Sequence, residues 1–448
     1  MQVYITKTNI ENTISILEKK FSSLEDKGCF FALITNEYDD NGNIVYDFFD
    51  VIEKGLSCGY KYINTIVYPS LLNCESHIQD NVKYIVWLCK NPKEMLFNKD
   101  FIREKHIWKD VEWGKRAKNY NPKGKDPGNV WIPTIDDGKA NITEHILLSD
   151  EDVIKKLLTM TCCGDNYQIF DDSYSNEKCN KYSLPSFTRE ISSAITSPRV
   201  VFGTSEMMKS ISSNSVSLVV TSPPYWNLKD YFKEGQIGQE SYDTYIDRMK
   251  MVWKQCFDKL TSNGTMWVNI NTRVHEGKTV LIPKDFIKVC KEIGFYYKGV
   301  VIWHKSSGIP THDKNIVDRH EYVLVFSKSN ELQIDISKLN SFSDYKNNYI
   351  NGKAFWNINR KAGSVGKNFI HPAIYPNGLV ERIVLCSTVE GDLVLDPFLG
   401  SGTSLIAAAN LSRNFIGYEF NEGFKELMES RYEKELNKDI NVIYQYDS

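Results

Sequence analysis

The chain has 448 residues, of which 42% are hydrophobic and 25% are charged, and its formal net charge is −3. This length favours two domains, and the composition is that of an ordinary globular protein with ample material for a core. The charge balance excludes a uniformly basic nucleic-acid binder, so any contact with DNA must come from local basic patches. No apolar run has the length of a membrane span, and the first residues lack a signal-peptide pattern.

The ten cysteines are scattered along the chain, with one adjacent pair, Cys162-Cys163, and no C-x-x-C spacing. Such usage is typical of reduced thiols inside a cell and favours neither a disulfide framework nor a zinc site. We therefore expect a cytoplasmic protein without a metal centre.

The sequence pattern of the first 190 residues recurs in a later part of the chain. Gly59-Tyr60 lies 235 positions before Gly294-Phe295, and in both places the pair stands between an amphipathic helix and a strand. Six such anchors follow one order at spacings between 225 and 238, which indicates an internal duplication. Generic α/β periodicity that imitates a repeat is the alternative. Besides Gly59-Tyr60, the six anchors pair Gly28 with Gly264, Tyr68 with Trp303, residues 82–90 with 320–328, residues 129–131 with 354–356, and His145 with His371.

The segment from Phe97 to Asn129 combines basic and aromatic residues. Nine lysines and arginines occur in it, with Trp108, Trp113 and Tyr120 interleaved among them. Basic side chains neutralise phosphates, and aromatic rings stack on bases or wedge between them, so the segment is a candidate for DNA binding. A solvated charged loop is the alternative interpretation.

A rigid loop follows a short strand near the middle of the chain. The β-branched run 216–220 indicates a buried strand, and Thr221-Ser222-Pro223-Pro224-Tyr225 comes directly after it. The two prolines fix φ and remove two backbone donors, which leaves carbonyl oxygens turned outward. Acceptors next to Tyr225 and Trp226 suit a planar ring that carries an amino group. A proline-terminated strand with an aromatic residue packed below it is the alternative.

A second motif lies towards the C-terminus. Residues 393–403 are typical of a strand, a turn containing Gly400 and Gly402, and the start of a helix, and a later apolar stretch ends in Glu419. Glu419 follows Asp396 by 23 residues, a spacing at which a carboxylate can accept ribose hydroxyls beside a doubly wound sheet. Because Gly-Ser-Gly departs from the dinucleotide fingerprint, the motif favours a nucleoside with a small charged tail over a pyrophosphate.

Together the two motifs resemble those of the amino-group DNA methyltransferases that use S-adenosyl-L-methionine. In that family a D-P-F-x-G-x-G-T segment binds the cofactor and a [S/D/N]-P-P-[Y/F] loop holds a flipped target base; the matching residues here are 396–403 and 222–225. Since the catalytic loop precedes the glycine loop, the order is that of the family's permuted β group. The resemblance spans roughly residues 198–435, and other matching stretches are 235–240, 303–305, 319–326 and 371–376.

The resemblance implies a doubly wound, Rossmann-like α/β sheet with circularly permuted motif order in residues 191–448. Residues 1–190 would then be a degenerate copy of the same fold, because they contain no Pro-Pro-Tyr loop and residues 170–174 supply no Gly-x-Gly. Such a copy would bind neither cofactor nor target base and would serve as a DNA-binding or pseudo-dimer partner. Because β-group members often pair, we expect a monomer with this internal pseudo-dimer.

The resemblance also assigns roles to single residues. Tyr225 would stack on the flipped base, while the Ser222 side chain and the Pro223 carbonyl would accept its amine hydrogens. The residues expected at the catalytic centre are Ser222, Pro223, Pro224 and Tyr225. Those expected at the cofactor are Asp396, Pro397, Phe398, Gly400, Ser401, Gly402, Thr403, Glu419, Asn421, His371 and Pro372. Those expected to contact DNA are Trp226, His304, Lys305, Arg319, Lys115, Arg116 and Lys118.

The implied reaction is methyl transfer from S-adenosyl-L-methionine to the exocyclic N4 of cytosine in double-stranded DNA. The target nucleotide must leave the stack, at a cost of about a few kcal/mol. Within the family, Ser at the first loop position accompanies cytosine N4 and Asp accompanies adenine N6, so adenine N6 is the alternative. A bacterial or archaeal restriction-modification system with a cognate endonuclease is the expected setting. A non-catalytic DNA-binding protein and an RNA methyltransferase are the interpretations from other classes.

Overall fold

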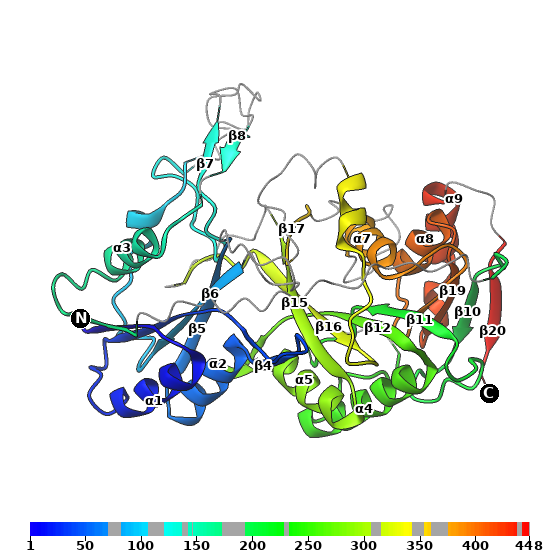
Figure 1. The fold of residues 1–448 in the computed structure, drawn as a ribbon, viewed down its shortest axis with the longest axis horizontal. Helices are drawn as coiled ribbons and strands as arrows, with labels where there is room; N and C mark the ends of the chain where they lie inside the picture. Colours follow the sequence, from blue (N-terminus) through cyan, green and yellow to red (C-terminus); the bar gives the residue numbers. More distant parts are fainter. Residues whose placement is uncertain are drawn as a thin grey trace.

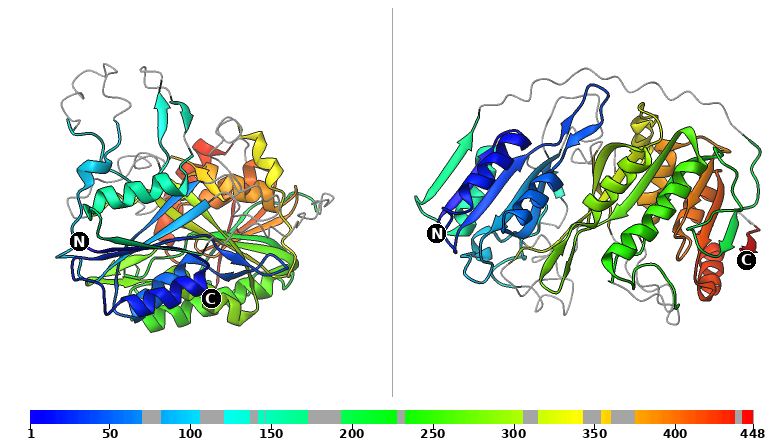
Figure 2. Two further views of the ribbon diagram at one scale, coloured as in Figure 1. Left: turned by 60° about the vertical axis from the view of Figure 1, so that its left-hand side comes forward. Right: turned by 90° about the horizontal axis from the view of Figure 1, so that it is seen from below.

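A computed structural model of the chain describes residues 1–69, 82–105, 121–136, 142–145, 147–172, 193–227, 233–305, 315–342, 354–359, 375–436 and 441–447. The described elements form two α/β units, one from each half of the chain, which lie side by side along the long axis of the molecule (Figures 1 and 2). Within the described ranges no helix has the length and apolar character needed to cross a membrane.

The C-terminal unit is built on a nine-stranded sheet with the order β17-β15-β16-β12-β11-β18-β19-β10-β20. The strand β16 is antiparallel to both of its neighbours, and all other neighbouring pairs are parallel. The strands, in chain order, are β10 (Arg199–Phe202), β11 (Val216–Thr221), β12 (Leu260–Ile270), β15 (Tyr296–His304), β16 (His320–Ser327), β17 (Phe355–Asn357), β18 (Leu393–Asp396), β19 (Asn414–Glu419) and β20 (Ile443–Tyr446).

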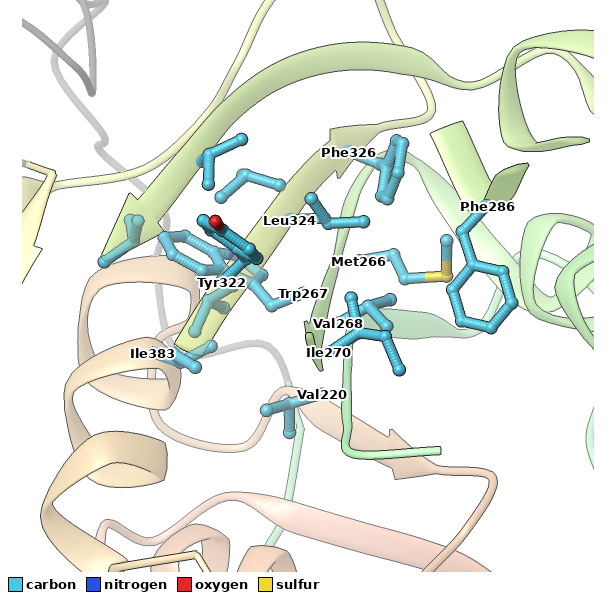
Figure 3. Close-up of a cluster of buried hydrophobic side chains, with 14 of the residues drawn as sticks. Val220, Met266, Trp267, Val268, Ile270, Phe286, Tyr322, Leu324, Phe326 and Ile383 are labelled. Atoms are coloured by element: carbon cyan, nitrogen blue, oxygen red, sulfur yellow. The ribbon is translucent and has the colours of Figure 1, made fainter. Parts of the chain in front are cut away.

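Helices cover both faces of this sheet. Figure 1 shows α4 (Tyr242–Lys259) and α5 (Ile282–Ile293) on one face, and α7 (Asn377–Ser387), α8 (Thr403–Asn410) and α9 (Lys425–Glu435) on the other. Since both faces are covered, the central strands are buried throughout, as for β11 and β19. Apolar side chains of β12 and β16 meet those of α5 and α7 in this core (Figure 3). Full burial of each such apolar side chain stabilises the folded state by about 1.5–3 kcal/mol.

The strands β11 and β18 are neighbours at the centre of the sheet although they are far apart in the chain. From β11 the chain passes through α4 to β12 on one side, and from β18 it passes through α8 to β19 on the other side. The strand order therefore reverses between them, and the carboxyl ends of the two parallel strands open at one edge. This arrangement confirms the predicted doubly wound fold with permuted order, and it brings the catalytic loop next to the glycine loop.

The N-terminal unit contains a five-stranded sheet with the order β5-β6-β2-β1-β9. Its strands are β1 (Val3–Lys7), β2 (Cys29–Ile34), β5 (Lys61–Pro69), β6 (Val82–Cys89) and β9 (Tyr167–Asp171), and its helices are α1 (Ile10–Lys20), α2 (Phe48–Ser57) and α3 (Asp150–Thr161). The short strands of the chain are β3 (Glu37–Tyr38), β4 (Ile44–Tyr46), β7 (Thr134–Asp136), β8 (Ile142–His145), β13 (Arg273–His275) and β14 (Lys278–Val280), and the 3₁₀ turns are η1 (Lys99–Ile102), η3 (Ile336–Ser341) and η4 (Glu422–Phe424).

The five strands of the N-terminal sheet repeat five strands of the larger sheet, in the order β15-β16-β12-β11-β18 and with the same relative directions. A bulge even recurs at the same place, because Ile63 is skipped in the pairing of β5 with β6 and Lys298 in that of β15 with β16, 235 positions later. The backbone N–H of Val67 bonds to the Asn129 carbonyl, as that of Ile302 does to the Ala354 carbonyl. The N-terminal half is thus a partial copy of the same fold, as predicted.

The copy differs at the two places where the C-terminal unit, called the catalytic unit below, has the proline loop and the glycine loop. Matching the strand registers places Ile169 at the position of Asp396, and the side chain of Ile169 is 39% exposed. Thr6 takes the position of Thr221, but the chain then turns into α1 instead of a proline loop. The described part of the N-terminal unit has no counterpart of β19, β10 or β20. It therefore lacks the strand whose end carries Glu419.

Candidate active site

A cavity opens at the carboxyl ends of β10, β11, β18 and β19. It is lined by the catalytic loop on one side, through Ser222 and Pro224, and by the glycine loop on the other. The predicted cofactor residues that line it are Pro397, Phe398, Gly400, Ser401, Glu419 and Asn421. Residues from two segments 175 positions apart thus share one cavity, because the strands that precede them are neighbours in the sheet.

The backbone of the catalytic loop is fixed from below. The Tyr245 hydroxyl on α4 donates a 2.8 Å hydrogen bond to the carbonyl of Pro224. Two prolines already fix φ in the loop, so this bond fixes a segment with little remaining freedom. The Pro224 carbonyl is therefore used within the protein. The side chain of Ser222 lines the cavity and lies 3.4 Å from Nδ2 of Asn269 on β12.

A hydrogen-bonded cluster holds the Tyr225 side chain. Its hydroxyl donates to Oε2 of Glu321 at 3.1 Å, and Nδ2 of Asn269 donates to the same oxygen at 2.8 Å. The other carboxylate oxygen accepts from Nζ of Lys305 at 2.7 Å. Burial alone would raise the pKa of Glu321, but the nearby ammonium of Lys305 and the hydrogen bonds outweigh burial and lower it. Glu321 is therefore a carboxylate that orients the ring of Tyr225.

The side chain of Trp226 is engaged within the protein. Its Nε1 donates to the Glu240 carbonyl at 2.8 Å, and its ring meets those of Tyr242 and His275 with centroid distances of 5.0 and 4.7 Å. Trp226 thus joins the catalytic loop to the stretch 235–240, and its predicted contact with DNA stays a prediction.

Asp396 is completely buried and organises both loops. One of its oxygens accepts from the Thr221 hydroxyl at 2.6 Å and from the Phe398 N–H at 3.0 Å. The other accepts from Ser404 at 2.5 Å and from Tyr375 at 3.4 Å. Burial raises the pKa of Asp396, and these donors oppose the rise. Asp396 is not among the residues that line the cavity, and its bonds to Thr221 and Phe398 join the two loops. Its predicted contact with the cofactor stays a prediction.

The glycine loop is held from behind by Arg431 of α9. The buried guanidinium donates to the Ser401 carbonyl at 2.9 Å, to the Ser401 hydroxyl at 2.7 Å and to the Thr403 hydroxyl at 2.8 Å. An ion pair with Glu435 at 3.1 Å balances its charge. Such charge-assisted bonds are roughly twice as strong as neutral ones. Thr403 is thus turned towards Arg431, and the loop between Phe398 and Thr403 has a fixed shape.

Gly402 is required where the glycine loop enters α8. Its φ is +84°, and a Cβ atom there would lie 2.6 Å from the Tyr432 hydroxyl. Residues other than glycine rarely adopt such a conformation, and contact with the ring adds a second obstacle.

Glu419 ends β19 at the wall of the cavity. Its two carboxylate oxygens accept from the backbone N–H groups of Gly400 at 2.8 Å and Asn421 at 2.7 Å. Burial raises the pKa of Glu419 to about 7, against the effect of these donors. A carboxylate offers about four acceptor positions, so Glu419 keeps acceptor capacity for a hydroxyl group of a ligand beside its backbone donors.

The basic residues predicted to bind DNA phosphates are placed differently. Lys305 is 3% exposed and paired with Glu321, and Arg319 is 5% exposed and paired with Glu104 at 2.9 Å. Burial, with the charge of Arg319 nearby, lowers the pKa of His304 to about 3, so its imidazole is neutral. Lys305 and Arg319 are therefore engaged in ion pairs within the protein, and the predicted contacts of these three residues with DNA stay predictions. His371, Pro372, Lys115, Arg116 and Lys118 lie outside the described residues.

Several residues at the cavity were missed by sequence reasoning. Residues 203–205 follow the end of β10, a position from which the rule for parallel sheets could have predicted them. Arg248 of α4 also lines the cavity and pairs with Glu206 at 2.8 Å, a contact with no sequence signal. Lys233, Tyr418 and Phe420 also belong to this group. The other lining residues, Gly235, Gln236, Ile237, Tyr375 and Leu399, lie in stretches that the resemblance had already marked. The described residues contain no group of three or more side chains suited to bind a metal ion.

Comparison with known proteins finds a matching family model, similar proteins and similar solved structures. A family model described as DNA methylase, of the N6/N4 type, matches residues 216–430. Type II methyltransferase M.Cfr9I of Citrobacter freundii is 31% identical over 270 residues, which are 53% of this chain and 87% of that protein. M.SmaI of Serratia marcescens is 30% identical over 303 residues, 60% of this chain and 97% of the relative. Among solved structures, PvuII DNA methyltransferase (cytosine-N4-specific) is 24% identical, with a TM-score of 0.45, over 55% of this chain and 89% of the other.

Proposed function

The chain belongs to the family of N6/N4 DNA methylases, and from that premise we propose that it methylates the exocyclic N4 of cytosine in double-stranded DNA. It is a DNA methyltransferase of the type II family, and S-adenosyl-L-methionine is its cofactor. The observation that supports the proposal most is the shared cavity, which joins the Ser222 side of the catalytic loop to the glycine loop. A methyl donor in one part of it can reach an amine held in the other.

The residues of the cavity fit the cofactor. Glu419 has acceptor positions left for the ribose hydroxyls, and Asn421 lies beside it at the cavity wall. Backbone of the glycine loop surrounds the space for the methionine part, and Phe398 and Phe420 offer apolar surface. When bound, S-adenosyl-L-methionine supplies a methyl group activated by its sulfonium.

The catalytic loop holds the target. We assign to Tyr225 the stacking on the flipped ring, which offsets part of the cost of leaving the duplex. The Ser222 hydroxyl and the Pro223 carbonyl accept the two amine hydrogens and so direct the nitrogen lone pair towards the methyl carbon. Since the amine is a poor nucleophile, holding both reactants in line supplies most of the rate.

The choice of cytosine rests on Ser222. The family resemblance associates Ser at this position with cytosine N4, and a hydroxyl is a neutral acceptor where the adenine enzymes mostly have a carboxylate. Adenine N6 is the second candidate, because the cytosine-N4 and adenine-N6 enzymes share the rest of the loop.

The test is mass spectrometry of nucleosides from DNA incubated with the protein and methyl-labelled S-adenosyl-L-methionine. Label in N4-methylcytosine is the expected result, with Ser222→Ala as the control that should lower it. Label in N6-methyladenine would keep the methyltransferase and overturn the choice of base. Label in RNA and not in DNA would favour an RNA methyltransferase. Absence of label in both DNA and RNA would favour a non-catalytic DNA-binding protein.

We also propose that the boundary between the two units lies near residue 190 and that the chain acts as a monomer. The proposed setting is a restriction-modification system in which a cognate endonuclease cuts unmodified sites. Restriction of cellular DNA extracts with a panel of endonucleases, before and after treatment with the protein, would identify the protected site.

A further inference from the structure

We propose that the N-terminal unit is a non-catalytic partner that positions the methylation site. It does so through hydrogen bonds of Asn64 and Asn129 to the segment Asn315–Arg319. This proposal rests on the proposed function only in that methyl transfer is the activity measured. It gives a role to a half of the chain that lacks both functional loops.

The contact between the two units is arranged like that of a symmetric dimer. Glu53 of α2 and Lys288 of α5 occupy equivalent positions, 235 apart, and they form an ion pair with each other. Tyr84 and Tyr322 are also equivalent, and both rings lie against Phe48, at centroid distances of 4.2 and 5.3 Å. Equivalent residues meet one another only near a two-fold axis, so the units are related by an approximate one.

Part of this contact has no symmetric counterpart. The Asn129 side chain accepts from the backbone N–H of Arg319 at 2.8 Å and donates to Oδ1 of Asp318 at 2.8 Å. It also donates to Oδ1 of Asn64 at 2.9 Å, and Asn64 in turn donates to Asn315 at 3.2 Å. All the hydrogen-bonding groups of these two amides are thus directed at one segment or at each other.

Matching the registers shows that these two asparagines are special to the N-terminal unit. The position of Asn64 corresponds to Gly299 in the catalytic unit, and that of Asn129 corresponds to Ala354. Neither residue has a side chain that could make these bonds. A second catalytic unit in the same place could therefore not hold the segment, whereas the N-terminal unit does.

The segment is bound along its whole length. Ile316 is 1% exposed and belongs to the hydrophobic core of the N-terminal unit, not to that of its own unit. Val317 pairs with Gly128, and the Arg319 guanidinium reaches Glu104 at 2.9 Å and the Asp126 carbonyl at 2.6 Å. These contacts on successive residues hold the backbone of the segment in one position.

This segment leads directly to the residue that orients Tyr225. The Arg319 carbonyl accepts from the backbone N–H of Lys305 at 2.7 Å, and two residues later Glu321 receives the Lys305 ammonium and the Tyr225 hydroxyl. A shift of the backbone at Arg319 would therefore move Glu321 relative to the catalytic loop. The cofactor side of the cavity has no part in this chain of contacts.

The experiment replaces Asn129 by Ala, the residue that the catalytic unit has at this position, in the full-length protein. Turnover, KM for DNA and the fluorescence of 2-aminopurine at the target position are measured, together with S-adenosyl-L-methionine affinity and Tm. We expect turnover to fall by about tenfold or more and the signal of the flipped base to decrease, with cofactor affinity changed less than about twofold. Lys288→Ala is the matched control, because it removes an ion pair at the same contact between units but away from the segment.

A second variant separates positioning from loss of folding. Asn129→Asp places a carboxylate against that of Asp318 and should lower turnover further, and adding Asp318→Asn should restore a donor and recover part of the loss. Equal turnover of Asn129→Ala and wild type, or a loss no larger than in Lys288→Ala at equal Tm, would overturn the proposal. If the wild-type protein itself transfers no methyl group, the proposed function fails instead, so the two failures are distinct.

Discussion

The hydroxyl of Tyr225 donates a 3.1 Å hydrogen bond to the carboxylate of Glu321, which is itself bonded to Asn269 and Lys305. The aromatic ring of the catalytic loop is thus fixed by a charged group on a different strand, β16. A ring that is held in place before the base arrives loses less conformational freedom on binding than a free one.

Replacing Tyr225 by Ala should lower methyl transfer by about 100-fold or more, because stacking on a base is worth roughly 1–3 kcal/mol and the ring also positions the base. Tyr225→Phe keeps the ring and loses only its bond to Glu321, so we expect a loss of about fivefold, as for one hydrogen bond of about 1 kcal/mol. Single-turnover rates of methyl transfer should decrease in the order wild type, Tyr225→Phe, Tyr225→Ala. Equal rates for Tyr225→Ala and Tyr225→Phe would show that Tyr225 does not stack on the base.

Glu321→Gln should impair catalysis more than Tyr225→Phe, since it leaves the buried ammonium of Lys305 without a carboxylate. Removing one partner of a buried pair costs about 3–5 kcal/mol, so Tm should fall as well. In the double variant Glu321→Gln with Lys305→Met, part of the Tm should return while the rate stays low. Affinity for S-adenosyl-L-methionine, measured by calorimetry, should be unchanged in both variants.

Affinity for S-adenosyl-L-methionine should depend on pH through Glu419. The pKa of this residue is raised to about 7 because it is buried, and hydroxyl donors of a ligand favour its ionised form. Binding should therefore weaken as the pH falls, by roughly 30-fold between pH 8 and pH 5.5 for a single group with that pKa. Glu419→Gln should bind more weakly at pH 8 and should lack this part of the dependence; an identical pH profile in the variant would exclude Glu419 as its source.

The same group predicts the pH dependence of stability. An acid whose pKa is raised in the folded state contributes its stability fully below the unfolded pKa, and the contribution is lost as pH rises through the folded value of about 7. Without ligand, Glu419→Gln should therefore stabilise the protein more at pH 8 than at pH 5. Denaturant titrations at the two pH values would measure the difference.

Arg431→Met should weaken cofactor binding and lower Tm together, since three hydrogen bonds to the glycine loop depend on its guanidinium. Bonds to a charged group are worth about 1.5–3 kcal/mol each before the loop relaxes, so we expect at least a tenfold rise in Kd. Lys434→Ala, on the same helix but solvent-exposed, is the control and should leave both quantities unchanged. A normal Kd in Arg431→Met would mean that the loop keeps its shape without it.

Gly402→Ala should destabilise the protein by about 1–3 kcal/mol, because its φ is +84° and the new methyl group would lie 2.6 Å from the Tyr432 hydroxyl. Adding Tyr432→Phe should recover only a small part of the loss, because a ring carbon that would lie 2.7 Å from the new methyl group stays in place. Gly378→Ala in α7 is the opposite case, since a Cβ there meets no atom within 4 Å and φ is not positive. That substitution should stabilise by up to about 1 kcal/mol, as measured by chemical denaturation.

The sequence by itself determined the fold class and the two loops, because each depends on local chemistry. Prolines after a β-branched run define the loop at Ser222–Tyr225, and glycines after an apolar strand define the turn at Gly400 and Gly402. The repeat of the N-terminal half was also indicated, since six anchors recur in one order at spacings between 225 and 238, and the shared bulge was added by the structure.

Only the tertiary structure decided which charged residues serve the site and how. Arg319 and Lys305 looked like surface cations for phosphates, but both are buried and paired with carboxylates, one of them from the other half of the chain. Arg431 lies in no motif, and Glu321 lies in a stretch that was marked only as a strand, although these two residues fix the glycine loop and Tyr225. The physical reason is that an ion pair depends on distance in space, and residues 16 and 215 positions apart carry no local pattern that records it.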